Sequence, residues 1–156
     1  MTLDLYSSFT SLVIDRPVDG VLRLTMNRPE KLNSLDADGH QQLADIWRVI
    51  DRDTETRAVL LCGKGKAFSA GGDFEVAKKL TESAQERAKM WREARDLVYN
   101  MINCSKPIVS AINGSAVGAG LAAALMSDIP IATKKAKLVD GHVRLGVAAG
   151  DHAAMI

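Results

Sequence analysis

Short apolar runs alternate along the chain with longer segments of helical periodicity. Runs rich in valine, isoleucine and leucine predict strands at 11–16, 21–26, 58–62, 108–112, 129–133 and 137–139. Apolar residues three or four positions apart predict amphipathic helices at 36–51 and 84–102, and a cluster of small residues predicts a helix at 118–127. Strands that alternate with helices indicate an α/β fold with a largely parallel sheet. The length of 156 residues corresponds to one domain, residues 1–156.

Turn residues, a helix cap and helical periodicity give further predictions for the hairpin and the two amphipathic helices. The segment Pro17–Gly20 separates the first two strands and predicts a β-hairpin with a longer loop. Ser34 or Asp36 can cap the helix that follows, and His40 is expected on the surface of that helix. The next helix should bury a stripe made of Ala84, Ala88, Trp91, Ala94, Val98 and Met101. Its exposed face should hold Glu86, Lys89, Glu93 and Asp96.

Charge and composition exclude several classes of partner. The chain carries 20 Lys+Arg against 19 Asp+Glu, so it lacks the basic excess that binds nucleic acids and anionic membranes. Aromatic residues make up 4% of the chain, too few for base-stacking platforms. The longest apolar run, 116–126, is shorter than the roughly 20 residues that span a bilayer. We therefore expect neither a nucleic-acid nor a membrane partner.

The N-terminus and the cysteines indicate a cytoplasmic protein. Residues 1–6 have neither the basic nor the apolar region of a signal peptide. Cys62 and Cys104 are far apart, without a Cys-x-x-Cys motif or a neighbouring histidine. Two free thiols in a reducing compartment are the expectation, and no metal site is expected.

Two glycine-rich turns share one arrangement, in which a strand runs through a turn into the start of a helix. Phe68–Asp73 follows the strand at 58–62, and Asn113–Gly120 follows the strand at 108–112. Glycine lets a backbone approach a ligand closely, and a helix N-terminus supplies unpaired N–H groups. Two such turns at neighbouring strand ends can aim two N–H donors at one oxyanion. The alternative is that these glycines serve only tight turns and close packing.

The second turn also fits a dinucleotide-binding fingerprint. Gly118–Ala123 matches G-x-G-x-x-G/A, and Asp140 lies about 20 residues further on, where a ribose-binding acid is required. A strand should lead almost directly into the first glycine of that fingerprint, whereas 113–117 intervene here. An NAD-dependent oxidoreductase is therefore kept only as a less favoured alternative.

Four ordered motifs resemble those of the crotonase (enoyl-CoA hydratase/isomerase) superfamily. Phe68–Asp73 is similar to F-x-A-G-A-D, and Pro107–Gly120 is similar to P-x-I-A-A-V-N-G-x-A-x-G-G-G. Asn27–Leu35 resembles N-R-P-x-x-x-N-A-L, and Ser127-Asp128 matches the C-D turn that precedes a strand. The resemblance covers the chain from the hairpin onward and implies a ββα-spiral core.

The resemblance also implies a site. The oxyanion-hole N–H groups would belong to Gly72 and Ala119, and they would bind the thioester oxygen of an acyl-CoA as it becomes an enolate. The main chain around Lys31, Leu32, Ser34 and Ala70 would line the path of the adenine and pantetheine. Lys66 would meet a phosphate of coenzyme A, its alternative role being that of an exposed solubilising lysine.

Two departures from the family pattern concern the chemistry. Hydratases of the family use two glutamates, which would fall at Ala122 and His142 in this chain. A standard two-glutamate hydration is therefore not expected, and His142 becomes the candidate acid/base because imidazole titrates near neutral pH. Asp151 is the candidate that orients it, in a spacing similar to that of the β-diketone hydrolase branch. Asp140 and His152 are alternative partners, and a helix N-cap is the alternative role of Asp151.

The resemblance implies an acyl-CoA enzyme of the isomerase, C–C hydrolase or lyase, or decarboxylase type. A catalytically silent acyl-CoA-binding member of the family is the alternative that the missing glutamates suggest. Coenzyme A would enter as part of the substrate, with no permanently bound cofactor. Family members form trimers or dimers of trimers through further C-terminal helices. Because this chain stops on the apolar residues 153–156, we expect it to be an incomplete spiral core without that trimerisation region.

Overall fold

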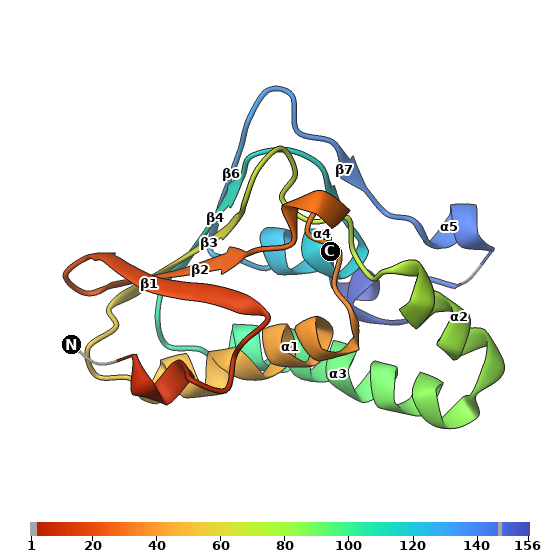
Figure 1. The fold of residues 1–156 in the computed structure, drawn as a ribbon, viewed down its shortest axis with the longest axis horizontal. Helices are drawn as coiled ribbons and strands as arrows, with labels where there is room; N and C mark the ends of the chain where they lie inside the picture. Colours follow the sequence, from red (N-terminus) through yellow and green to blue (C-terminus); the bar gives the residue numbers. More distant parts are fainter. Residues whose placement is uncertain (1–2, 147) are drawn as a thin grey trace.

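The computed structural model describes residues 3–146 and 148–156, apart from the side chain of Leu145. A five-stranded sheet in the order β1-β2-β3-β4-β6 forms its centre (Figure 1). These strands are β1 (Leu12–Val18), β2 (Val21–Met26), β3 (Ala58–Gly63), β4 (Ile108–Ile112) and β6 (Ile129–Ala132). Only β1 runs antiparallel to its neighbour, while β2, β3, β4 and β6 are parallel. The predicted α/β fold with a largely parallel sheet is confirmed.

The hairpin between β1 and β2 is confirmed, but the prediction of a longer loop is wrong. Val18 pairs with Val21, so only Asp19 and Gly20 form the turn. Gly20 takes a φ of +76°, which suits a tight hairpin turn. Pro17 lies inside β1, at a shift of register between Asp15 and Val18, on the edge strand where a proline is tolerated.

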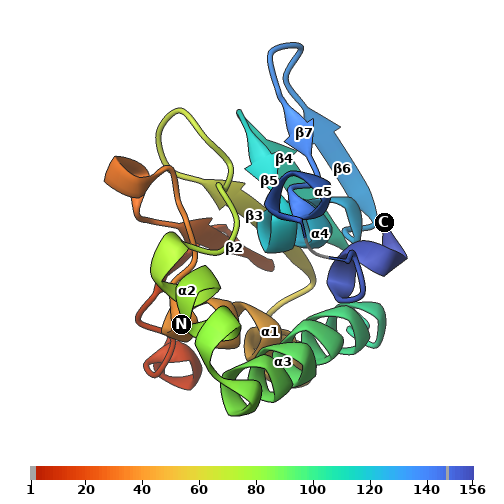
Figure 2. The same ribbon diagram turned by 90° about the vertical axis from the view of Figure 1, so that its right-hand side faces the viewer.

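One face of the sheet is covered by helices α1 (Ala37–Arg52) and α3 (Ala84–Ile102) (Figure 2). Asp36 caps α1, because its side chain accepts a hydrogen bond from Gly39 N. Burial alternates along β2, as expected for a strand with one face on the core. The core consists of residues such as Leu22, Leu24, Leu43, Ile46, Trp47, Ile50 and Leu61, all without exposed surface.

The prediction of which residues of α3 are buried is wrong in two respects: the N-terminal part of the predicted stripe is not buried, and a residue predicted to be exposed is buried. Trp91 is 64% exposed, whereas Glu93, expected to face solvent, is only 9% exposed. The buried face consists of Glu93, Ala94, Leu97, Val98 and Met101. His40 is likewise not a surface residue, since it is 3% exposed. It lies three residues before Leu43, on the α1 face that packs on α3.

The remaining elements include several that the sequence pattern did not predict. These are α2 (Phe74–Glu82), β5 (Ala116–Val117), α5 (His142–Leu145) and the short 3₁₀ helices at Asp4–Tyr6, Pro29–Lys31 and His152–Met155. The predicted helix after β4 is α4 (Gly118–Leu125), and β7 (Leu138–Val139) pairs with β5 outside the main sheet. No helix in the described part of the chain is long and apolar enough to cross a membrane.

Candidate active site

The two glycine-rich turns lie directly against each other. Ser69 N donates to Ser115 O at 3.0 Å, and Val117 N donates to Ser69 O at 2.9 Å, which forms a short parallel bridge between the turns. Gly71 has a φ of +81°, and a Cβ at this position would lie 2.8 Å from Val117 O. A residue without a side chain is therefore required where the turns meet. Close packing, the alternative role for these glycines, holds for Gly71.

Gly72 follows this contact and presents a free backbone donor. Its neighbours are fixed, since Leu35 N donates to Gly71 O at 2.7 Å and Asp73 N donates to Leu35 O at 2.9 Å. Among the residues that the structure describes, none accepts a hydrogen bond from the N–H of Gly72. A Cβ built at Gly72 meets nothing within 4 Å, so this position opens onto free space.

Ala119 stands on the other side of the same contact. It is the second residue of α4, and the first N–H groups of an α-helix have no acceptor within the helix. The preceding Gly118 has a φ of +51°, and a Cβ there would lie 3.8 Å from Gly71 Cα. Gly71 and Gly118 thus lie close together. Each of them is followed directly by a residue with a free N–H group, Gly72 in one case and Ala119 in the other. The N-terminus of α4 also favours negative charge at this point.

A loop that begins with the 3₁₀ helix Pro29–Lys31 brings together the predicted coenzyme A residues. Ala70 N donates to Leu32 O at 2.9 Å, so this loop runs along the first glycine-rich turn. Leu32 and Asn33 both take positive φ angles, 54° and 57°. Lys31 is exposed on the loop and Ser34 is buried in it.

The side chain of Asn33 holds this loop in place, a role that sequence reasoning did not assign. Its amide Nδ2 donates to Lys64 O at 2.9 Å and to Ala67 O at 2.8 Å, and its Oδ1 accepts from Arg28 N. The loop that carries the exposed Lys66 is thereby fixed beside residues 28–34. The structure therefore gathers all five predicted coenzyme A residues on adjoining loops.

His142, the first residue of α5, is held between two carboxylates. Its Nε2 lies 3.0 Å from Asp151 Oδ2, and its Nδ1 contacts Asp140 Oδ1. Burial opposes the charged imidazole, but the hydrogen bonds and charges of Asp140 and Asp151 outweigh burial and raise the pKa of His142. Asp140 is exposed, and its hydrogen bond to His142 lowers the pKa of its carboxyl. Two of the three candidate partners, Asp151 and Asp140, thus contact His142, whereas His152 does not.

Asp151 combines the two roles that the sequence left open. Its Oδ1 accepts from Ala153 N at 2.9 Å, so it caps the 3₁₀ helix His152–Met155, while its Oδ2 faces His142. Burial disfavours its charged form, yet His152, the Ala153 N–H and His142 together lower the pKa of Asp151 well below its usual range. This carboxylate is therefore charged and fixed, whereas Asp140 is charged and open to solvent.

Comparison with known proteins identifies the family of the chain. A family model described as enoyl-CoA hydratase/isomerase matches residues 17–156. The chain belongs to this family.

Relatives and solved structures agree with this assignment. The chain is 39% identical over 130 residues to the 1,2-epoxyphenylacetyl-CoA isomerase of Escherichia coli (strain K12), covering 82% of this chain and 50% of the relative. It is 37% identical over 131 residues to the (E)-benzylidenesuccinyl-CoA hydratase of Thauera aromatica, covering 83% and 50%. A solved enoyl-CoA hydratase/isomerase from Mycobacterium paratuberculosis superposes with a TM-score of 0.83 at 41% identity, covering 88% and 55%. The chain thus has the crotonase-like fold and spans about half the length of these relatives.

Ala122 is the position at which the motif resemblance would place the first glutamate of a hydratase. It is completely buried in α4, whose described residues are all glycine, alanine or leucine. No proton-transferring group is therefore available from this helix. Asp140, the acid required by the alternative dinucleotide fingerprint, is engaged with His142.

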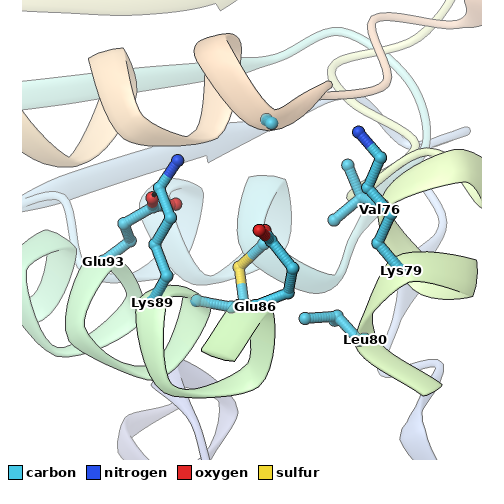
Figure 3. A pocket seen from close by; sticks show the side chains of 8 residues that line it. Val76, Lys79, Leu80, Glu86, Lys89 and Glu93 are labelled. Atoms are coloured by element: carbon cyan, nitrogen blue, oxygen red, sulfur yellow. Dashed lines mark ion pairs between the residues drawn. The ribbon is translucent and has the colours of Figure 1, made fainter. Parts of the chain in front are cut away.

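A buried histidine–carboxylate pair joins helices α1 and α3. His40 Nδ1 is 2.8 Å from Glu93 Oε2, and Lys89 Nζ lies 3.7 Å from Glu93 Oε1. Glu93 and Lys89 also line a pocket between α1, α2 and α3, together with apolar residues such as Val76 and Leu80 (Figure 3). Helical spacing could have revealed the burial of His40, because it falls on the stripe that contains Leu43, Ala44 and Trp47.

Proposed function

We propose that the chain binds an acyl-CoA thioester and stabilises an enolate through the N–H groups of Gly72 and Ala119. The observation that carries this proposal is the contact of the two glycine-rich turns, which leaves one free donor on each side. An enolate bears its negative charge on the former thioester oxygen, so two converging donors stabilise it more than the neutral substrate. The CoA thioesters in the names of the two relatives support this substrate class.

His142 transfers the proton in this proposal. Its ring keeps a proton more readily than a free imidazole because two carboxylates face it. Asp151 fixes the orientation of the ring through Nε2, and the exposed Asp140 is the partner that a substrate can displace from Nδ1. With Ala122 in place of a glutamate, the reactions compatible with this set are isomerisation, C–C cleavage and decarboxylation, which proceed through the same enolate, and thioester hydrolysis, which proceeds through a tetrahedral oxyanion that the same two donors can stabilise.

The contacts of the His142 ring with two carboxylates also favour a second candidate function, acyl-CoA binding without catalysis. Both ring nitrogens are occupied by carboxylates, which leaves neither free for a substrate unless Asp140 moves away. A protein in which Asp140 stays in place would bind acyl-CoA without turning it over. The two candidates share the thioester site and differ only in the proton transfer.

Exchange of the α-hydrogen of bound acyl-CoA distinguishes the two functions. A panel of acyl-CoA thioesters in deuterated buffer, followed by mass spectrometry, should show deuterium at the α-carbon with the wild-type chain. His142→Ala should abolish exchange while retaining CoA affinity, and Asp140→Asn should retain exchange. CoA binding without any exchange would favour the silent protein. Exchange that persists in His142→Ala would refute the acid/base assignment.

A further inference from the structure

A series of hydrogen bonds leads from the side chain of Arg28 to the peptide group that carries the free N–H of Gly72. Arg28 Nη1 donates to Ser34 O at 2.9 Å. Leu35 N, which belongs to the same peptide group as Ser34 O, donates to Gly71 O at 2.7 Å. Gly71 O in turn shares its peptide group with Gly72 N. Two peptide groups thus stand in line between the guanidinium and the proposed oxyanion donor.

The second of these peptide groups sets the direction of the Gly72 N–H. The described residues contain no cis peptide bond, and in a planar trans peptide the C=O and the N–H point in opposite directions. Because Gly71 O faces Leu35 N, the Gly72 N–H points away from Leu35. The parallel bridge between Leu35 and Gly72, in which Asp73 N donates to Leu35 O, requires the same orientation. The hydrogen bond from Leu35 therefore keeps the donor of Gly72 both free and oriented.

Two carboxylates fix Arg28 at the start of this series. Arg28 Nη1 forms ion pairs with Asp36 Oδ2 at 3.0 Å and with Asp73 Oδ2 at 3.6 Å. Asp36 directly follows Leu35, and Asp73 directly follows Gly72, so the guanidinium holds both sides of the bridge. The other oxygen of each carboxylate caps a helix, α1 or α2. The negative charge of these two groups is therefore shared between Arg28 and the N-termini of the two helices.

The charge of Arg28 strengthens the donors along the series. A cation at a peptide oxygen polarises that peptide and makes its N–H a better donor, and the effect passes on to the next peptide. Ser34 and Leu35 are buried, and only a quarter of the Arg28 side chain is exposed, so water screens the series little. A stronger Gly72 N–H stabilises an enolate oxygen more than a neutral thioester oxygen, because only the enolate bears the charge.

We propose that Arg28 is a positioning residue that orients and polarises the N–H of Gly72 through the peptide groups Ser34–Leu35 and Gly71–Gly72. This inference rests on the proposed function in taking Gly72 as an oxyanion donor. It gives the loop at residues 28–35 a part in the proton-transfer chemistry, in addition to the coenzyme A contacts proposed for it.

NMR of the free chain tests the series without any substrate. A hydrogen bond between two peptides gives a scalar coupling between the donor nitrogen and the acceptor carbonyl carbon. We expect this coupling between Leu35 and Gly71 in the wild-type chain, because the bond between them is short. The amide proton signals of Leu35 and Gly72 should move upfield in Arg28→Gln, since both donors lose polarisation. Absence of the coupling would overturn the proposal.

Two substitutions separate the charge of Arg28 from its ability to donate. Arg28→Lys keeps a cationic donor, whereas Arg28→Gln keeps only a neutral amide donor. The assay is α-exchange in deuterated buffer, at saturation with the panel thioester that the wild-type chain exchanges fastest. The rate should fall roughly five- to tenfold in Arg28→Gln and stay within about threefold of wild type in Arg28→Lys. The matched control is Arg23→Gln on β2, whose guanidinium bonds Asp15 instead and whose loss should leave the rate unchanged.

The carbonyl band of the bound thioester is a readout that a purely structural role would not move. A stronger donor lowers the stretching frequency of the carbonyl. The infrared band should therefore move back toward its position in free solution in Arg28→Gln, but not in Arg28→Lys. A residue that only holds the loop in place would instead weaken CoA binding and leave the band of the bound thioester where it is.

The outcomes separate this inference from the proposed function. Wild-type exchange in folded Arg28→Gln, or a loss of more than about threefold in Arg28→Lys, refutes the role of the charge and leaves the acyl-CoA proposal intact. If Arg28→Gln does not fold, the Arg28→Lys rate and the coupling between Leu35 and Gly71 decide in the same way. Undiminished exchange in Gly72→Pro refutes the proposed function even where the free chain shows the coupling.

Discussion

The candidate site joins two regions that are built on different principles. Around Gly72 and Ala119 the functional groups are backbone N–H groups, placed by glycines and by the start of α4. Around His142 the proposed groups are side chains, those of His142 itself and of its two partners Asp140 and Asp151. At Gly72 the first region has room for a side chain and needs the backbone N–H, whereas the second region depends on its side chains. The proposed function therefore depends on both the shape of the backbone and the packing of side chains.

The largest expected effect comes from removing a backbone donor. Gly72→Pro deletes the proposed oxyanion N–H without breaking any hydrogen bond among the described residues. Turnover or α-exchange should fall about 10²- to 10³-fold, the usual effect of losing one oxyanion-hole donor. Gly72→Ala is the matched control, since its Cβ meets nothing within 4 Å and its N–H remains. Equal activity of the two variants would remove Gly72 from the site.

A substitution one residue earlier should affect stability instead. Gly71→Ala places a Cβ 2.8 Å from Val117 O at a φ of +81°, so the turns must separate. We expect a loss of about 1–3 kcal/mol in the free energy of unfolding, measured by urea denaturation. Gly72→Ala should lie close to wild type in the same experiment. If the two alanine variants are equally stable, the contact between the turns is not as close as described.

The two regions also differed in how well the sequence predicted them. The turns are contiguous motifs: their strand, turn and helix order suggested a pair of backbone donors, and the resemblance of the motifs to those of the crotonase superfamily singled out Gly72 and Ala119. The two partners of His142 lie within nine residues and were also foreseen. Glu93 and His40 were assigned to the surface, because their contact depends on how α1 and α3 are rotated against each other. A polar residue on a buried stripe violates the simple amphipathic pattern, and only tertiary packing shows its partner.

The second region should make stability depend on pH in a defined window. The raised pKa of His142 means that its ion pairs stabilise the fold below about pH 6.5 and are lost as the pH rises through its folded value. The lowered pKa of Asp151 means that its contribution is complete above about pH 4 and is lost at lower pH. Thermal unfolding should therefore show highest stability near pH 5, decreasing by about 1 kcal/mol or less toward pH 8.

A variant separates this effect from general charge effects. His142→Gln should flatten the decrease between about pH 6 and 8. The Gly72→Ala chain should keep the wild-type profile, because it leaves every ionisable group in place. A pH profile that is the same with and without His142 would show that its ion pairs do not contribute to folding.

The smallest effect is expected at the charged side chain of the backbone-built region that we assign to a phosphate of coenzyme A. Lys66 is exposed on the loop fixed by Asn33, so its attraction to a phosphate of coenzyme A is weakened by water and salt. Lys66→Ala should weaken CoA binding roughly two- to fivefold at low salt, and the difference should vanish near about 0.5 M salt. Lys78→Ala, an exposed lysine on α2, is the control. A loss much larger than this at Lys66, or one insensitive to salt, would mean that this region too depends on a side chain for binding.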